Sequence, residues 1–155
     1  MRSDSWPARV LIVCDGYPPL QVDRPALVAQ TTVSGWLDGG AQVEVLTAET
    51  LRTPDYPLGY SETEESWYDG VPVYRVRVAA PGVLLPGWRA YGRPVLTLAV
   101  DEAIRRFRPS VICQVNGPVF GHVPEVQARL HGVPFDLVDM TILLHFGDDE
   151  SAVTM

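Results

Sequence analysis

The chain repeats one pattern, in which a short apolar run is interrupted by a turn and followed by a stretch with helical spacing of apolar residues. Residues 10–14 form the first apolar run, and the turn at residues 15–19 interrupts it. Residues 43–47 and 111–115 repeat the run further along the chain. Runs that alternate with helices indicate a parallel β-sheet, and such sheets bind ligands at the carboxyl ends of their strands. A functional site is therefore expected in the loops that follow these runs.

Length and charge favour one globular domain without a nucleic-acid partner. A chain of 155 residues is long enough to bury about 70% of its unfolded surface. Its net charge is −7, and its basic residues cluster only at Arg105, Arg106 and Arg108, which we interpret as the solvated end of a helix. Nucleic-acid surfaces need clustered positive charge, and this chain lacks it. No stretch approaches the length of about 18 apolar residues that a membrane span needs, so no span is predicted.

The cysteines and histidines indicate a reducing compartment and no metal site. Cys14 and Cys113 each lie inside an apolar run, so we expect both to be buried thiols. The three histidines are far apart, and no spacing of cysteine and histidine suits zinc. The N-terminal residues do not resemble a signal peptide. We therefore expect a cytoplasmic protein without a metal or other cofactor.

The first two predicted helices have clear boundaries in the sequence. The first begins after Asp23, which caps it, and ends at the pair Gly39-Gly40. The second carries apolar residues at helical spacing over residues 95–107, and Pro109 ends it.

The third predicted helix lies near the end of the domain. It begins at residues 122–124, buries Val126 and Leu130, and ends at Gly132. Residues 135–140 follow as the last strand.

Between the second run and the second helix, the sequence predicts mostly loop. Residues 49–70 have no apolar period and are expected to form a surface excursion without regular structure. Residues 71–78 form a strand whose proline and two outward-pointing arginines suit the edge of a sheet. Residues 80–93 are expected to form a loop that exposes Trp88 and Tyr91.

Right-handed crossovers and short connections favour the order 3-2-1-4-5 for the strands numbered along the chain. Strands one and four are then neighbours, and the direction of the crossovers reverses between them. The crevice of this sheet is therefore expected between the loop at residues 15–25 and the loop at residues 116–122.

Polar side chains and glycines follow strands one and four. Asp15 is placed to accept a hydrogen bond from a sugar hydroxyl, or else to tie down the turn with Gly16. Asn116 precedes Gly117, and its amide either binds a hydroxyl or forms a turn. Both pairs of alternatives remain open.

The start of the third helix offers a further candidate, because a helix N-terminus attracts anions such as phosphate. Gly121 and His122 stand at that start, with a capping or surface histidine as the alternative. The first loop has neither a dinucleotide-binding G-x-G-x-x-G motif nor a phosphate-binding P-loop motif. The acidic pair Asp148-Asp149 is interpreted as part of a solvated tail.

Five segments between residue 9 and about residue 138 occur in the order of a known family: VLIVCDGYPP, DGGAQVEVLTAET, DGVPVYRVRV, AIRRFRPSVI and NGPVFGHVPEVQARLHGVPF. Together they resemble the N-terminal domain of family 4 retaining glycosyltransferases of the two-domain GT-B type. The stretch from Tyr56 to Tyr60 is similar to the branch that builds surface polysaccharides. The resemblance implies a three-layer, Rossmann-like α/β domain with a mainly parallel sheet, one half of a GT-B fold.

The same resemblance implies transfer of a sugar from a nucleotide-sugar to an acceptor hydroxyl of a glycan or small molecule. No catalytic residue is assigned, and the cleft is expected to be lined by Asp15, Gly16, Asn116, Gly117, Gly121 and His122. Two departures from the family bear on this activity. Residues 20–25 read LQVDRP where the family has a pair of glycines, and the donor-binding second domain is not in this sequence.

We therefore expect a half-enzyme that is inactive alone and needs a second domain or subunit. The alternative is a non-catalytic α/β binding or partner module that has lost donor binding. A flavodoxin-like or receiver-type domain is less well supported, because strand one lacks an acidic pair and the last strand lacks a lysine.

The expected organisation is a tail at residues 1–8, the domain at residues 9–140, and a truncated C-terminal segment at residues 141–155. The apolar run at residues 141–146 is expected to be exposed and to promote self-association.

Overall fold

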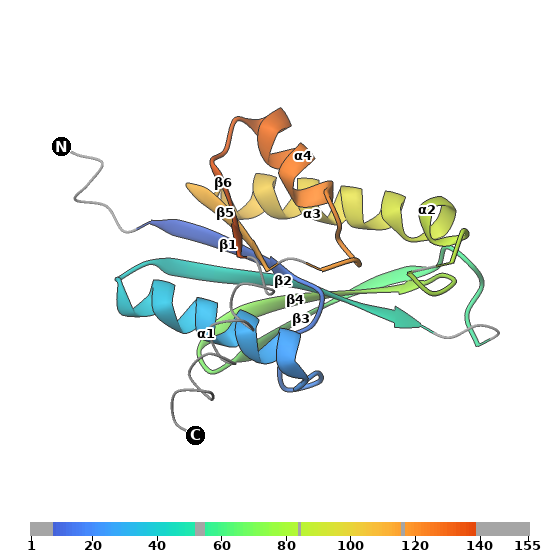
Figure 1. Ribbon diagram of the computed structural model, residues 1–155, viewed down its shortest axis with the longest axis horizontal. Coiled ribbons are helices and arrows are strands. Elements are labelled where there is room, and N and C mark those ends of the chain that lie inside the picture. The colour runs from blue at the N-terminus through green and yellow to red at the C-terminus, as the bar shows by residue number, and fades with distance from the viewer. Residues whose placement is uncertain (1–7, 52–54, 84, 116, 139–155) are drawn as a thin grey trace, which may run out of the picture.

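The computed structural model describes residues 8–51, 55–83, 85–115 and 117–138. One sheet of six strands in the order β3-β4-β2-β1-β5-β6 forms the middle layer, with helices on both faces (Figure 1). Neighbouring strands are parallel except for the antiparallel pair of β3 and β4. In chain order the elements are β1 (Arg9–Cys14), α1 (Arg24–Asp38), β2 (Gln42–Leu51), β3 (Ser61–Tyr68), β4 (Val71–Ala79), α2 (Trp88–Tyr91), α3 (Arg93–Phe107), β5 (Val111–Val115), α4 (Val123–His131) and β6 (Phe135–Val138).

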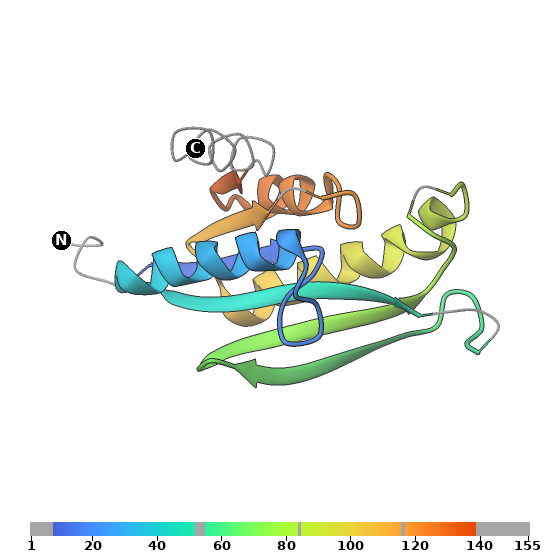
Figure 2. The ribbon, with the colours of Figure 1, turned by 60° about the horizontal axis from the view of Figure 1, so that its bottom comes forward.

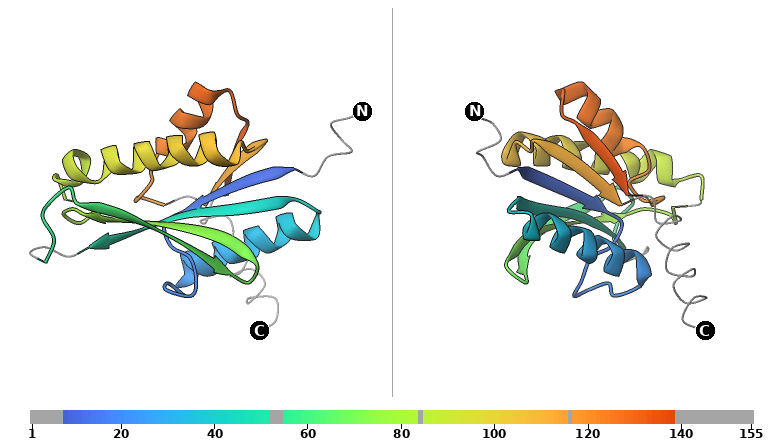
Figure 3. Two further views of the ribbon diagram at one scale, coloured as in Figure 1. Left: turned by 180° about the vertical axis from the view of Figure 1, so that it is seen from behind. Right: turned by 60° about the vertical axis from the view of Figure 1, so that its left-hand side comes forward.

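The five predicted strands take the predicted order, with β1 between β2 and β5. Ile12 of β1 pairs with Val45 of β2 on one side and with Cys113 of β5 on the other. Helix α1 covers one face of the sheet, while α3 and α4 cover the other (Figure 3). Two apolar clusters result, one on each face of the sheet. The α/β class expected from the sequence is confirmed.

The prediction of an irregular excursion at residues 49–70 is wrong in two places. Strand β2 continues to Leu51, and β3 forms the outer edge of the sheet beside β4 (Figure 2). Strand β3 has no apolar period because it is mostly exposed and carries acidic side chains opposite arginines of β4. Glu64 pairs with Arg75 in the register and contacts Arg77 at 3.1 Å. A charged edge strand also discourages pairing with a further chain.

Strand β4 is consequently an inner strand, and the prediction that it forms the edge is wrong. Its arginines differ in their surroundings. Arg75 was expected to point outward but is only 2% exposed, whereas the Arg77 side chain remains partly exposed and binds Glu49 at 2.7 Å.

The loop predicted at residues 80–93 contains the short helix α2, and its aromatic residues differ in burial. Tyr91 is exposed as expected, but Trp88 is buried. The indole packs against the backbone of Gly92, where an added Cβ would lie 2.3 Å from the ring. A residue without a side chain at position 92 is therefore what allows Trp88 into the core.

The bounds of α4 agree with the predicted third helix, but its predicted buried face is wrong. Val126 is 46% exposed and Leu130 is 73% exposed. Helix α4 instead buries Val123, Gln127 and Ala128, since it packs along α3 through this other stripe.

Helix α1 begins as predicted, because the Asp23 carboxylate accepts a hydrogen bond from the Ala26 amide at 3.2 Å. Replacing Asp23 with alanine is expected to lower the free energy of unfolding by about 1 kcal/mol, since a helix-terminal amide loses its partner. Urea unfolding followed by circular dichroism measures this change. The control is Asp38→Ala at the other end of the helix, where losing a negative charge does not destabilise. Equal losses for both variants would contradict the capping role.

Cys14 and Cys113 are buried free thiols on neighbouring strands, as predicted. Burial is the main cause that raises the pKa of Cys14 to about 12 and that of Cys113 to about 11. Thiol titration should therefore be slow for the native protein and should give two free groups in denaturant. Fast native reaction of either thiol would contradict this arrangement.

Within the described ranges, each helix is too short or too polar to cross a bilayer.

Candidate functional site

A cavity of about 320 Å³ lies at the carboxyl ends of β1 and β5. Its walls come from the loop between β1 and α1 and from the loop between β5 and α4. From β1 the chain crosses to β2 through α1 on one face, whereas β5 is reached through α3 on the other face. Crevices form where crossovers diverge in this way. The lining residues are Asp15, Gly16, Gln21, Asp23, Pro25, Val115, Gly117, Pro118 and Val119.

The structure brings together three of the six site residues predicted from sequence. Asp15, Gly16 and Gly117 line the cavity. Gly121 and His122 do not. The Gly121 carbonyl accepts a hydrogen bond from the Gln114 side chain at 2.8 Å.

The His122 side chain is 95% exposed and lies 3.7 Å from Glu125. It borders a different hollow, between α3 and α4. Asn116, the remaining predicted residue, lies outside the described residues.

Asp15 joins the two loops that form the cavity. Its carboxylate accepts hydrogen bonds from the amides of Val119 at 2.9 Å and Phe120 at 3.2 Å. Burial raises the pKa of Asp15, and the two amide hydrogen bonds oppose that rise. Asp15 therefore ties its own loop to the far loop, which differs from the tie to its own turn with Gly16 that the sequence offered as one alternative. The carboxylate also remains part of the cavity wall.

Gly117 is in close contact with this carboxylate. A Cβ added at Gly117 would lie 2.2 Å from Oδ2 of Asp15, which is far inside van der Waals contact. Only glycine fits here without moving Asp15 away from the amides that it binds.

Gln21 fills the first loop, and sequence reasoning did not single it out. Its Oε1 accepts hydrogen bonds from the Tyr17 amide at 3.0 Å and from the Arg75 guanidinium at 2.9 Å. Its Nε2 donates to the Ala48 carbonyl at 3.3 Å. The loop amide at Tyr17 is consequently occupied by a side chain of the same loop.

The buried side chain of Arg75 anchors the loop between β1 and α1. Besides Gln21, its guanidinium donates to the Tyr17 carbonyl at 3.3 Å. Burial is the main cause that lowers the pKa of Arg75. The sequence of β4 contains a signal for the burial of Arg75. Side chains alternate between the two faces of a strand, and Arg75 lies on the same face as the buried residues Val71 and Val73.

The electrostatics of the cavity suit hydroxyl groups better than phosphates. Asp15 and Asp23 are the ionisable side chains among the described residues that line it, and none of those residues is a lysine or arginine. Asp23 already caps the N-terminus of α1, which otherwise attracts an anion. In the part of the chain that the structure describes, no group of three or more histidine, cysteine or acidic side chains could hold a metal.

A mainly parallel sheet with this cavity defines the class of α/β proteins that bind ligands at the carboxyl ends of their strands. A family model, the glycosyl transferase 4-like domain, matches residues 25–151. The chain therefore belongs to this family of glycosyltransferase domains. No curated protein sequence matches the chain.

Two solved structures are similar to this chain at low sequence identity. One is the catalytic domain of starch synthase IV from Arabidopsis thaliana bound to ADP and acarbose, with 14% identity and a TM-score of 0.51 over 84% of this chain and 33% of that chain. Another is the trehalose-6-phosphate synthase from E. coli bound with UDP-2-fluoro glucose, with 11% identity and a TM-score of 0.45 over 84% of this chain and 32% of that chain. The fold is the Rossmann-like domain of GT-B glycosyltransferases. This chain spans about a third of the length of those structures.

Proposed function

We propose that this domain is the acceptor-side half of a retaining glycosyltransferase. In this proposal the sugar passes from a nucleotide-sugar to an acceptor hydroxyl only when a second domain or subunit supplies the donor site. The observation that carries the proposal is the cavity between the β1 and β5 loops, walled by the Asp15 carboxylate in a domain of this family.

The proposed acceptor contacts follow from the residues that line the cavity. Asp15 has lone pairs beyond those used by the two amides, and a carboxylate accepts readily from a sugar hydroxyl. Gly16 and Gly117 also line the wall, and the space beside their Cα atoms is filled by the side chains of Gln21 and Asp15. We include Asn116 in the proposed site because its neighbours Val115 and Gly117 both line the cavity.

The remaining parts of the proposal concern the setting of the reaction. Residues 9–140 are taken as the acceptor-side domain and residues 141–155 as the segment that follows it. Two buried free thiols favour a reducing, cytoplasmic setting.

The second candidate is a non-catalytic binding module that has lost donor binding. The Gln21 side chain favours it, since it occupies the loop where the donor phosphates of a transferase would need free amides. The two candidates differ in one respect: the half-enzyme gains activity from a donor-binding partner, and the binding module does not.

The isolated chain is expected to show no sugar transfer and to bind nucleotide-sugars only at millimolar concentration, near −4 kcal/mol. The physical reason is that the described cavity wall offers no cation for a diphosphate. Calorimetric titration with several nucleotide-sugars measures the binding, and a transfer assay measures turnover. Micromolar donor binding, or turnover without a partner, would contradict the half-enzyme.

The acceptor side is tested by NMR titration of the same chain with simple saccharides. Shifts are expected at the amides of Gly16 and Val119, and Asp15→Asn should weaken them because the carboxylate is lost. Asp38→Asn, which alters an exposed carboxylate far from the cavity, is the matched control. Equal shifts for both variants would argue against Asp15 as an acceptor contact.

A further inference from the structure

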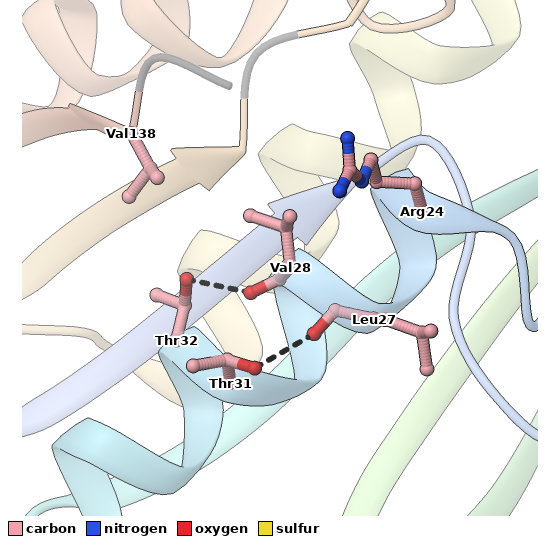
Figure 4. Close-up of a pocket in the computed structure, with 6 residues that line it drawn as sticks. All are labelled: Arg24, Leu27, Val28, Thr31, Thr32 and Val138. Carbon is pink, nitrogen blue, oxygen red and sulfur yellow. Dashed lines mark hydrogen bonds between the residues drawn. The ribbon is translucent and has the colours of Figure 1, made fainter. Parts of the chain in front are cut away.

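Helix α1 carries a second apolar stripe, on the side away from the β2–β4 part of the sheet. Arg24, Leu27, Val28, Thr31 and Thr32 recur at the spacing of one helix face. Together with Val138 of β6 they line a groove of about 480 Å³ (Figure 4). We call this the α1–β6 groove.

The groove exists because α1 leaves part of the sheet uncovered. Helix α1 packs mainly on β1, β2 and β5, whereas β6 continues the sheet beyond them as its edge strand. Leu27 is 47% exposed, and the opposite side of the same helix buries Ala26 and Ala29 against the sheet. Parallel sheets of this kind are ordinarily covered on both faces.

The threonine hydroxyls of the groove do not need hydrogen bonds from an occupant. The Thr31 hydroxyl donates to the Leu27 carbonyl at 3.0 Å, and the Thr32 hydroxyl donates to the Val28 carbonyl at 2.9 Å (Figure 4). Both hydroxyls therefore bond to their own helix. An apolar segment can bury this stripe without leaving either hydroxyl unpaired.

We propose that the apolar run at residues 141–146 of the same chain docks in the α1–β6 groove. Val138 lines the groove and is the last described residue, so the run follows it after residues 139 and 140. Six extended residues reach up to about 20 Å, and the helix from Arg24 to Thr32 is about 12 Å long. The run can therefore cover the stripe. Its apolar side chains are Ile142, Leu143, Leu144 and Phe146.

Charge supports the same occupant. The run is followed by Asp148-Asp149-Glu150, and Arg24 contributes an exposed guanidinium to the wall of the groove. One guanidinium beside an apolar floor complements an apolar run with an acidic end.

The competing occupant is the same run from a second copy, which is the self-association expected from the sequence. Attachment close to the groove favours the intramolecular arrangement, because a short connection gives an effective concentration of about millimolar. The two occupants differ in how docking depends on protein concentration.

The test measures the reactivity of a thiol placed in the groove of the full chain, as Leu27→Cys. This thiol should react about tenfold more slowly than in a chain that also carries Ile142→Ser, Leu143→Ser, Leu144→Ser and Phe146→Ser; tenfold corresponds to about 1.4 kcal/mol of docking free energy. Leu37→Cys, exposed on the same helix outside the groove, should react equally in both backgrounds. The native thiols Cys14 and Cys113 are buried, so their slow reaction reports an intact fold.

Protection that is independent of protein concentration supports docking within one chain. Protection that grows with concentration assigns the groove to a second copy and overturns the proposal, as does equal reactivity of Leu27→Cys in both backgrounds. If the fourfold variant unfolds, Phe146→Ser alone takes its place in the comparison. The reactivity of Leu27→Cys in the two backgrounds, and its dependence on protein concentration, then test the proposal in the same way.

Discussion

Replacing Gly117 with alanine is expected to lower the free energy of unfolding by about 3 kcal/mol. The new Cβ would lie 2.2 Å from Oδ2 and 2.5 Å from Cγ of Asp15. The carboxylate cannot move aside without losing its hydrogen bonds to the amides of Val119 and Phe120. Overpacking and the lost hydrogen bonds therefore act together, and the two loops that wall the cavity separate.

Urea unfolding of the Gly117→Ala variant measures the stability loss, and the saccharide titration measures the loss of the cavity. Gly35→Ala is the matched control, since an added Cβ at this position in α1 meets nothing within 4 Å. In a helix interior this control should raise stability by about 0.5–1 kcal/mol. A Gly117→Ala protein as stable as the wild type would show that Asp15 is not fixed between the loops.

The buried part of the sheet could be predicted from the sequence because burial on both faces leaves a plain signal. The cores of β1, β2 and β5 are buried and mostly apolar, as is typical of parallel strands covered on both faces. Connection rules then sufficed to order them, and the position of the cavity followed from that order.

Elements at the margins of the fold could not be predicted in the same way. Strand β3 is held by backbone pairing and by charges opposite β4, so its own sequence shows no apolar period. For α4 the periodicity was correct but the face was wrong, since Val126 and Leu130 have apolar side chains that the described part of the domain leaves exposed. Hydrophobicity alone does not say which of two stripes meets a neighbour.

The candidate site was predictable at the level of loops and not at the level of side chains. Topology brings Asp15 and Gly117 together, and the sequence was sufficient for that. His122 is close to Gly117 in sequence, yet its side chain is directed toward solvent at the start of α4. The hydrogen bonds of Asp15 and Gln21 depend on residues far apart in the chain, which spacing within one loop does not reveal.

Replacing Arg75 with methionine is expected to lower the free energy of unfolding by about 2–3 kcal/mol and to loosen the first loop. Each hydrogen bond to a charged group contributes roughly 1.5–3 kcal/mol, and Arg75 makes two, to Gln21 and to the Tyr17 carbonyl. Removing a buried charge offsets part of this loss, because the guanidinium is costly to bury. The net loss falls on the loop between β1 and α1, where both acceptors lie.

Limited proteolysis within residues 15–23 measures the loosening of this loop, and urea unfolding measures the stability of the whole domain. Arg77→Met is the matched control on the same strand. Its ion pairs with Glu49 and Glu64 involve partly exposed side chains, so their loss should cost about 1 kcal/mol or less and leave cleavage in the loop unchanged. If both variants are cleaved at the same rate in this loop, Arg75 does not anchor it. In that case the filled first loop must be maintained by Gln21 through Tyr17 and Ala48 alone.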